Sequence, residues 1–230
     1  MQFSLIIPSY NNSGELIKEL PGLIAFLKEK GIAPEVLIIN DGSPDIAALK
    51  EFCLSGNYKL ISHEVNLGKG AAVRTGIRHA QHEIRIFTDA DIPFQYDIFP
   101  TMLQAFSQKD VMMVAGDRRK SDYFSKTPLV RRMGSMVFSW LVNLIMGRNL
   151  GDTQCGIKGF RAAVVDQVFG NAKLNGFAAD IEWIYRTSKS NSRIAWVNAE
   201  FRNAGESSVV FWKQAIKMLR DVIRLRMSGL

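Results

Sequence analysis

The chain has 230 residues, of which 47% are hydrophobic and 22% charged, as in an ordinary globular protein. This composition excludes collagen-like and disordered chains, and two distant cysteines, Cys53 and Cys155, suggest no disulfide framework and a reducing compartment. The first residues lack signal-peptide features and no apolar run reaches about 18 residues, so we predict no leader and no transmembrane helix. A net charge of +7 favours an anionic partner: a nucleotide, a nucleic acid or an acidic lipid surface.

The first half of the sequence alternates between short apolar runs and amphipathic stretches. The predicted strands are 3–7, 36–39, 59–62 and 84–87, and the predicted helices between them are 16–30, 46–54 and 71–80. A helix over 98–107, a strand over 111–115, a helix running through Thr187 and a strand over 194–197 follow. Such alternation indicates βαβ units and a mainly parallel sheet.

Two segments of the second half carry apolar residues beside clustered positive charge. Residues 133–147 are free of charge and, at about 15 residues, too short to span a bilayer, which leaves a core helix or a helix in the membrane interface. Residues 209–227 are predicted to be a helix with Lys213, Lys217, Arg220 and Arg224 on one face. A basic amphipathic helix with a tryptophan, Trp212, is typical of a membrane surface; the alternative is a helix that covers the domain and exposes a solvated charged face.

The acids of Thr88-Asp89-Ala90-Asp91 directly follow the strand over 84–87. In an open α/β sheet the carboxyl ends of the strands form the ligand crevice. Two neighbouring acids repel each other unless a cation lies between them, and Mg²⁺ is usually held by one or two carboxylates plus substrate phosphate oxygens. The alternative is an ordinary Asp-rich turn.

The ordered set of polar motifs resembles the inverting glycosyltransferases of family 2 with the GT-A fold. The early motifs are Ile6-Ile7-Pro8-Ser9-Tyr10-Asn11, Asn40-Asp41-Gly42-Ser43, Asn66-Leu67-Gly68-Lys69-Gly70 and Thr88-Asp89-Ala90-Asp91. Three later motifs resemble the polyprenyl-phosphate sugar transferases, most of all the dolichyl-phosphate glucosyltransferase group: residues 152–158, 176–182 and 220–226.

The resemblance implies a Rossmann-like α/β GT-A domain over residues 1–208, with a mixed, mainly parallel sheet flanked by helices, and an amphipathic helix over 209–230. Residues 118–150 would face the acceptor and the membrane. The implied reaction moves a hexose, first of all glucose from UDP-glucose, onto a polyprenyl phosphate with Mg²⁺ or Mn²⁺. The enzyme would lie peripherally on the cytoplasmic face of a membrane, would bind no nucleic acid, and a homo-oligomer is left open.

The resemblance also implies a role for each motif residue. The donor would be bound by Pro8, Tyr10, Asn11, Asp41, Lys69, Arg74, Asp89, Ala90 and Asp91, with Asp91 and Asp89 as metal ligands. The acceptor phosphate would be bound by Arg118, Arg131 and Arg132, because arginine grips phosphate oxygens with a fork of donors. Catalytic roles would fall to Arg118, Asp152 and Asp180. A phosphomonoester is largely dianionic at neutral pH, with a second pKa near ~6, so the two acids are candidates for positioning or residual base work.

Two departures and several alternatives accompany this hypothesis. Asn40 replaces the first acid of the family's D-D-G-S motif, and Pro93 stands where some relatives have a further polar metal ligand. The alternatives are a GDP-mannose-dependent enzyme, a saccharide acceptor, a non-catalytic nucleotide-sugar-binding module and a nucleic-acid binder. Intact acidic motifs argue against the module, and positive clusters without interleaved base-stacking aromatics argue against nucleic acid.

Overall fold

The computed structural model describes residues 2–44, 46–119, 121, 129–190, 192–202 and 211–228. Within helices, the side chains of residues 129–132, 135 and 211–214 are also outside the description. The predictions for the side chains of Arg131, Arg132, Trp212 and Lys213 therefore lie outside the described residues.

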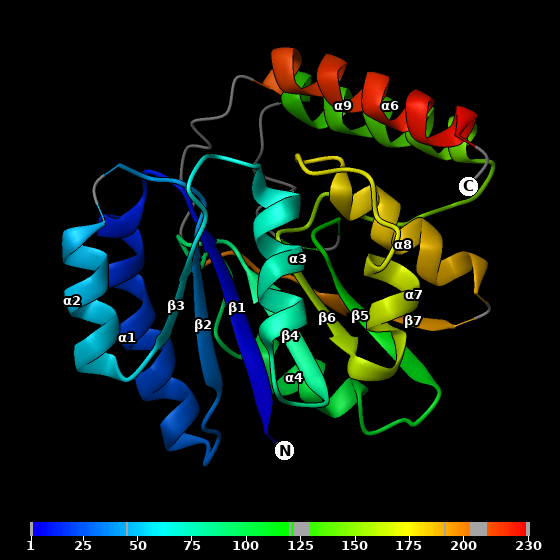
Figure 1. Ribbon diagram of the computed structural model, residues 1–230. Helices are drawn as coiled ribbons and strands as arrows, with labels where there is room; N and C mark the ends of the chain where they lie inside the picture. The colour runs from blue at the N-terminus through cyan, green and yellow to red at the C-terminus, as the bar shows by residue number, and fades with distance from the viewer. Residues whose placement is uncertain are drawn as a thin grey trace.

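A mixed sheet organises the described chain (Figure 1). Its strands are β1 (Phe3–Ser9), β2 (Glu35–Asn40), β3 (Lys59–Ser62), β4 (Ile84–Thr88), β5 (Val111–Asp117), β6 (Ile157–Arg161) and β7 (Arg193–Asn198). They lie in the order β3-β2-β1-β4-β6-β5-β7, and only β6 runs antiparallel to its neighbours, β4 and β5. The mixed, mainly parallel sheet is thereby confirmed.

Strand β6 was absent from the sequence prediction. Its residues, Ile157-Lys158-Gly159-Phe160-Arg161, contain a lysine and a glycine at the centre, which are both poor strand formers. Pairing on both sides overrides this preference: Lys158 lies opposite Phe87 of β4 and Ala115 of β5. Although it contains a lysine, the strand is buried along Ile157–Phe160.

The helices cover both faces of the sheet. They are α1 (Ser13–Glu29), α2 (Ala47–Gly56), α3 (Lys69–His79), α4 (Ile98–Ala105), α6 (Leu129–Met146), α7 (Val165–Phe169), α8 (Ala179–Lys189) and α9 (Phe211–Met227), and a 3₁₀ turn spans Ala162–Val164. One core lies under α1, α2 and α4, and the other under α3 and α6–α9. Because both faces are covered, strand β1 sends apolar side chains to both of them: Leu5 and Ile7 enter the first core and Ile6 enters the second.

Helices α6 and α9 lie side by side, at the top of the view in Figure 1, whereas the N-terminus and the start of β1 lie at the bottom. Phe138, Val142 and Met146 of α6 are buried in the second core, as are Met218, Val222 and Leu225 of α9. Both helices therefore pack on the domain with one face. In the described part of the chain, no helix has the length and apolar character needed to cross a bilayer.

Candidate functional site

The turns after β1 and β2 are joined to each other at the carboxyl edge of the sheet. The Asp41 amide donates to the Ser9 carbonyl at 2.8 Å, and the Asn11 amide donates to Ser43 Oγ at 3.0 Å. Asn11 adopts a left-handed backbone with φ 54°, which asparagine tolerates. Tyr10 is 48% exposed, while Pro8 is buried inside β1. Tyr10 and Asn11 can therefore meet a ligand with their side chains, and Pro8 acts through the path of the strand.

Asp41 is a buried carboxylate that is hydrogen-bonded within the protein. It accepts hydrogen bonds from the amides of Leu67 at 3.0 Å and Gly68 at 2.8 Å, and its Oδ1 lies 2.7 Å from His63 Nδ1. These contacts fasten the loop before α3 to the end of β2. Gly42, at φ +77°, completes the arrangement, since a Cβ there would lie 2.4 Å from the Val65 carbonyl carbon.

Two backbone amides in the first turn of α3 are already bound within the protein. The Asn175 carbonyl accepts from the Gly70 amide at 2.7 Å and from the Ala71 amide at 3.2 Å. Arg74 is also committed to this neighbour, since it donates to the Ala172 carbonyl at 3.1 Å and to Asn175 Oδ1 at 2.5 Å. A phosphate that binds these two amides, or the guanidinium of Arg74, would first have to displace the loop around residues 172–175.

Glu182 of α8 holds that loop from its other side. The carboxylate is fully buried and accepts hydrogen bonds from the amides of Lys173 and Leu174, with distances of 2.8 to 3.0 Å. Arg186, one turn along α8, pairs with the same group at 2.8 Å. The described contacts of Glu182 are thus structural, because they join α8 to the loop that contains Lys173 and Leu174.

The D-A-D turn brings the predicted metal ligands beside Lys69. Lys69 Nζ lies 2.5 Å from Asp89 Oδ1. Burial lowers the pKa of Lys69, but the charges of Asp89, Asp180 and Asp91 outweigh that effect and raise the pKa overall. Asp91 reaches solvent, yet partial desolvation and the nearby Asp89 charge raise its pKa to about 6. A cation bound beside Asp91 would stabilise its charged form.

The turn itself is held in a strained backbone. Ile92 is fully buried at φ 41°, a conformation that costs about 1–3 kcal/mol for a residue of this kind. The Arg202 amide donates to the Pro93 carbonyl at 2.8 Å, and the Arg202 guanidinium binds Glu19 and the Tyr96 hydroxyl. Because the surrounding contacts fix this turn, the carboxylates of Asp89 and Asp91 are presented at a defined place.

The residues of the turn fit a divalent ion that relies on its substrate for further ligands. The described residues include no group of three or more His, Cys, Asp and Glu side chains arranged to hold a metal. Pro93 offers no side-chain ligand, and its carbonyl is already occupied by Arg202. Asp89 and Asp91 alone suit Mg²⁺ or Mn²⁺, because such ions usually keep waters and substrate phosphates in their coordination shell.

Arg118 and Asp152 form a two-point ion pair beside the D-A-D turn. Arg118 Nε and Nη2 each lie 2.8 Å from an oxygen of Asp152, and the Arg118 amide donates to the same carboxylate at 2.9 Å. Although burial opposes it, Arg118 holds the pKa of Asp152 below its usual value. A Cβ on Gly156 would lie only 2.0 Å from Asp89 Oδ2, so the segment carrying Asp152 abuts the D-A-D turn directly.

Asp180 is paired with Lys158, a residue that sequence reasoning did not single out. Lys158 Nζ donates to Asp180 Oδ1 at 2.7 Å and to the Cys155 carbonyl at 2.6 Å, and the lysine is fully buried. A lysine within a strand normally indicates an exposed position. The position of Lys158 at the end of the motif over residues 152–158 was the signal available for finding it.

The structure thus divides the predicted site residues into two groups. Lys69, Asp89, Asp91, Arg118, Asp152 and Asp180 are connected by ion pairs, close approach or mutual electrostatic influence. Pro8, Asp41 and Arg74 support the loops around them, and Ala90 is buried within the turn.

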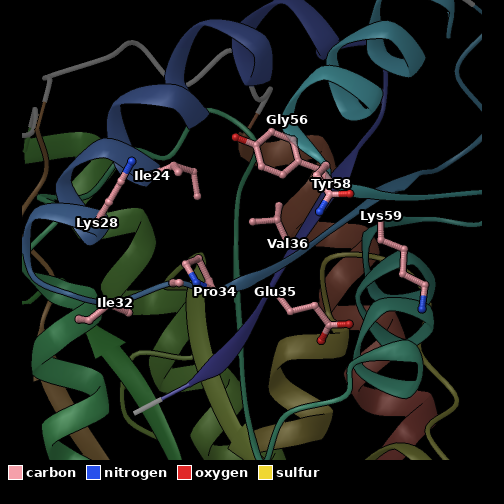
Figure 2. Close-up of a pocket in the computed structure, with 11 residues that line it drawn as sticks. Ile24, Lys28, Ile32, Pro34, Glu35, Val36, Gly56, Tyr58 and Lys59 are labelled. Atoms are coloured by element: carbon pink, nitrogen blue, oxygen red, sulfur yellow. The ribbon is translucent and has the colours of Figure 1, made fainter.

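A separate cavity of about 490 Å³, lined by Lys28, Glu35, Tyr58 and Lys59 among others, lies at the amino ends of β2 and β3 (Figure 2). It is therefore at the opposite end of these strands from Asp41.

Comparisons with known proteins show what this chain is similar to. The sequence pattern of glycosyl transferase family 2 matches residues 4–169. A dolichyl-phosphate beta-glucosyltransferase of Saccharomyces cerevisiae is 27% identical, with 99% of this chain and 75% of that protein covered. The one from Dictyostelium discoideum is 28% identical over 97% of this chain and 73% of that protein.

Solved structures share the fold. Glucosyl-3-phosphoglycerate synthase from Mycobacterium tuberculosis, crystallised with Mn²⁺, uridine diphosphate and phosphoglyceric acid, superimposes with a TM-score of 0.72 at 17% identity. The match covers 99% of this chain and 78% of that one. The predicted GT-A fold is thereby confirmed.

Proposed function

Because the chain belongs to glycosyl transferase family 2, we propose that it transfers a hexose from a nucleotide sugar to the phosphate of a polyprenyl lipid. The observation that carries this proposal is the direct contact between two predicted half-sites. The D-A-D turn suits the diphosphate of a donor, and the segment with Arg118 and Asp152 suits an acceptor phosphate; Gly156 packs against Asp89 where they meet. UDP-glucose is the proposed donor, since the relatives are named dolichyl-phosphate beta-glucosyltransferases.

Arg118 can serve the acceptor phosphate while it remains paired with Asp152. The pair uses Nε and Nη2 of the guanidinium, and the Arg118 side chain is still 32% exposed. Its Nη1 donors are therefore the ones directed to a ligand, and Asp152 fixes the plane in which they lie. In this proposal Asp152 is an orienting group rather than a base.

The proposed reaction is a single displacement with inversion. An oxygen of the lipid phosphate attacks C1 of the hexose, and the bond from C1 to the nucleoside diphosphate breaks, with the electron pair leaving on the diphosphate. Since the phosphate is already largely dianionic, little proton removal is needed. Mg²⁺ or Mn²⁺ bound at Asp89 and Asp91 would neutralise charge on the leaving diphosphate. The residues of this chain then accelerate the step mainly by positioning and by charge stabilisation.

The outer faces of α6 and α9 support a peripheral position on the membrane. They expose two apolar stripes on the sides opposite their buried residues: Met133, Met136, Val137, Trp140 and Leu144 on α6, and Ile216, Ile223 and Met227 on α9. Lys217, Arg220 and Arg224 are exposed on α9 next to the second stripe. Apolar side chains flanked by basic ones suit the interface of an anionic leaflet, which we propose to be the cytoplasmic one.

A donor panel tests the reaction. The protein is incubated with polyprenyl phosphate and radiolabelled UDP-glucose, GDP-mannose or another UDP-sugar, with Mg²⁺ or with EDTA. We expect label in the chloroform-extractable product from UDP-glucose with Mg²⁺, and a large loss with EDTA. Product from GDP-mannose alone would replace the proposed donor, and no lipid product from any donor would refute the function.

Liposome flotation tests the membrane surface. Trp140→Glu places a charge on the α6 stripe, and we expect it to reduce the bound fraction on anionic vesicles by several-fold. Leu54→Glu is the matched control, because Leu54 is 84% exposed on α2, outside both stripes. Equal flotation of the two variants would contradict the proposed surface.

A further inference from the structure

Lys158 occupies an unusual position for a charged residue. It lies at the centre of the sheet, opposite Phe87 of β4 and Ala115 of β5, and none of its surface is exposed. An ammonium group in such a place is strongly destabilised unless its hydrogen-bond donors are satisfied. The contacts of Lys158 therefore need an explanation beyond the packing of the core.

Those contacts lead to Asp180. Two donors of the ammonium go to Asp180 Oδ1 and to the Cys155 carbonyl, and the group lies 5.6 Å from the centre of the Phe87 ring. Among the described residues, the side-chain hydrogen bond to the Asp180 carboxylate comes from Lys158 and goes to Oδ1. The Asp180 side chain retains 8% exposure, so Oδ2 is the oxygen left for a ligand.

The same carboxylate borders the D-A-D turn. The charge of Asp180 acts on Lys69 together with the charges of Asp89 and Asp91. Lys69 and Lys158 also lie at similar distances from the Phe87 ring centre, 5.8 and 5.6 Å. Acidic and basic groups thus alternate from the surface inward, in the order Asp89, Lys69, Asp180 and Lys158.

We propose that Lys158 is a positioning residue, which holds the Asp180 carboxylate through Oδ1 and presents Oδ2 to the reacting sugar and phosphate. This inference rests on the proposed function. In this role Lys158 touches neither substrate, and it acts through Asp180 alone. The competing explanation is a buried ion pair that only joins β6 to α8.

Three variants separate these explanations: Lys158→Met, Asp180→Asn, and the double variant that carries both changes. If the pair has a positioning role, each single change lowers kcat by about 100-fold, the cost of a misplaced group, and leaves the KM for the donor within about twofold. Lys158→Met also lowers Tm, because it leaves a buried carboxylate unpaired. The double variant regains Tm, since neither charge remains, but stays as slow as Asp180→Asn.

The outcomes of this experiment distinguish a positioning role of the pair from a purely structural one. A double variant that regains both Tm and kcat would show that the pair is only structural, and so would near-native kcat in Asp180→Asn. Lys173→Met is the control and should match the wild type, because this lysine is exposed and binds Glu182 through its backbone amide. A wild-type protein that transfers no sugar overturns the proposed function and this inference together, whereas an active wild type with a fully active double variant overturns the inference alone.

Discussion

Two groups of acidic residues meet at the same edge of the sheet and differ in how their oxygens are used. Asp41 and Glu182 are buried, and each accepts at least two backbone amides from a neighbouring loop. Asp89 and Asp91 follow β4 as Asp41 follows β2, yet Asp89 pairs with a single ammonium group and Asp91 is exposed to solvent. The first pair holds loops in place, and the second pair is left open to a cation.

The difference shows that a motif acid is better interpreted from its unfilled hydrogen-bonding capacity than from its place in the motif. A carboxylate that accepts several amides is stabilised in its charged form by the protein alone. One that is partly desolvated and lies near another acid, as Asp91 lies near Asp89, is less stable when charged, and its pKa rises to about 6. Only the second kind gains from binding an ion.

The largest effect on turnover is expected when the Asp91 carboxylate is removed. Asp91→Asn should lower kcat with Mg²⁺ by about 100-fold or more, equivalent to about 2.7 kcal/mol of transition-state stabilisation. Because Asp91 is exposed, Tm should change little. Product formation and thermal unfolding of Asp91→Asn are compared with those of Asp97→Asn, an exposed aspartate at the start of α4. Equal activity of the two variants would remove Asp91 from the metal site.

A smaller effect is expected at the acceptor side. Arg118→Lys should raise the KM for polyprenyl phosphate by about tenfold, since an ammonium group cannot pair with Asp152 and also offer a second, oriented edge. Arg119→Lys is a close control, because Arg119 makes the same two-point pair with Asp117, at 2.8 and 2.6 Å, and is 51% exposed. Similar KM values for the two variants would show that Arg118 only pairs with Asp152 and does not bind the acceptor phosphate.

The sequence was sufficient for six of the seven strands of the described sheet and for the acids at the strand ends, because apolar periodicity and turn chemistry are local. It could not separate Asp41 from Asp89, since their partners, Leu67, Gly68 and Lys69, lie far away in sequence. It also missed β6, whose Lys158 and Gly159 disfavour a strand until β4 and β5 pair with it. Nor could it show that the Gly70 and Ala71 amides at the start of α3 donate to the Asn175 carbonyl, which lies over a hundred residues away in sequence.

The buried acids should respond in stability rather than in chemistry. Glu182→Gln places an amide group against the amides of Lys173 and Leu174, and we expect it to lower the free energy of unfolding by about 2–3 kcal/mol. At a temperature where the variant is folded, kcat should stay within about threefold of the wild type. Urea unfolding is compared with that of Glu83→Gln, at an exposed glutamate that should change stability by less than about 0.5 kcal/mol. A 100-fold loss of kcat in folded Glu182→Gln would place this residue in the chemistry.

The smallest effect is expected at the thiols, although Cys155 lies beside the site. Burial raises the pKa of Cys155 to about 12 and that of Cys53 to about 11, so both remain protonated at pH 8. A protonated, buried thiol is neither a nucleophile nor a metal ligand. We expect a thiol reagent such as dithionitrobenzoate to leave turnover unchanged and to react with two cysteines only after denaturation. Rapid reaction of the native protein with loss of activity would mean that the 152–158 segment opens, and that the contact between Gly156 and Asp89, on which the joined site depends, is transient.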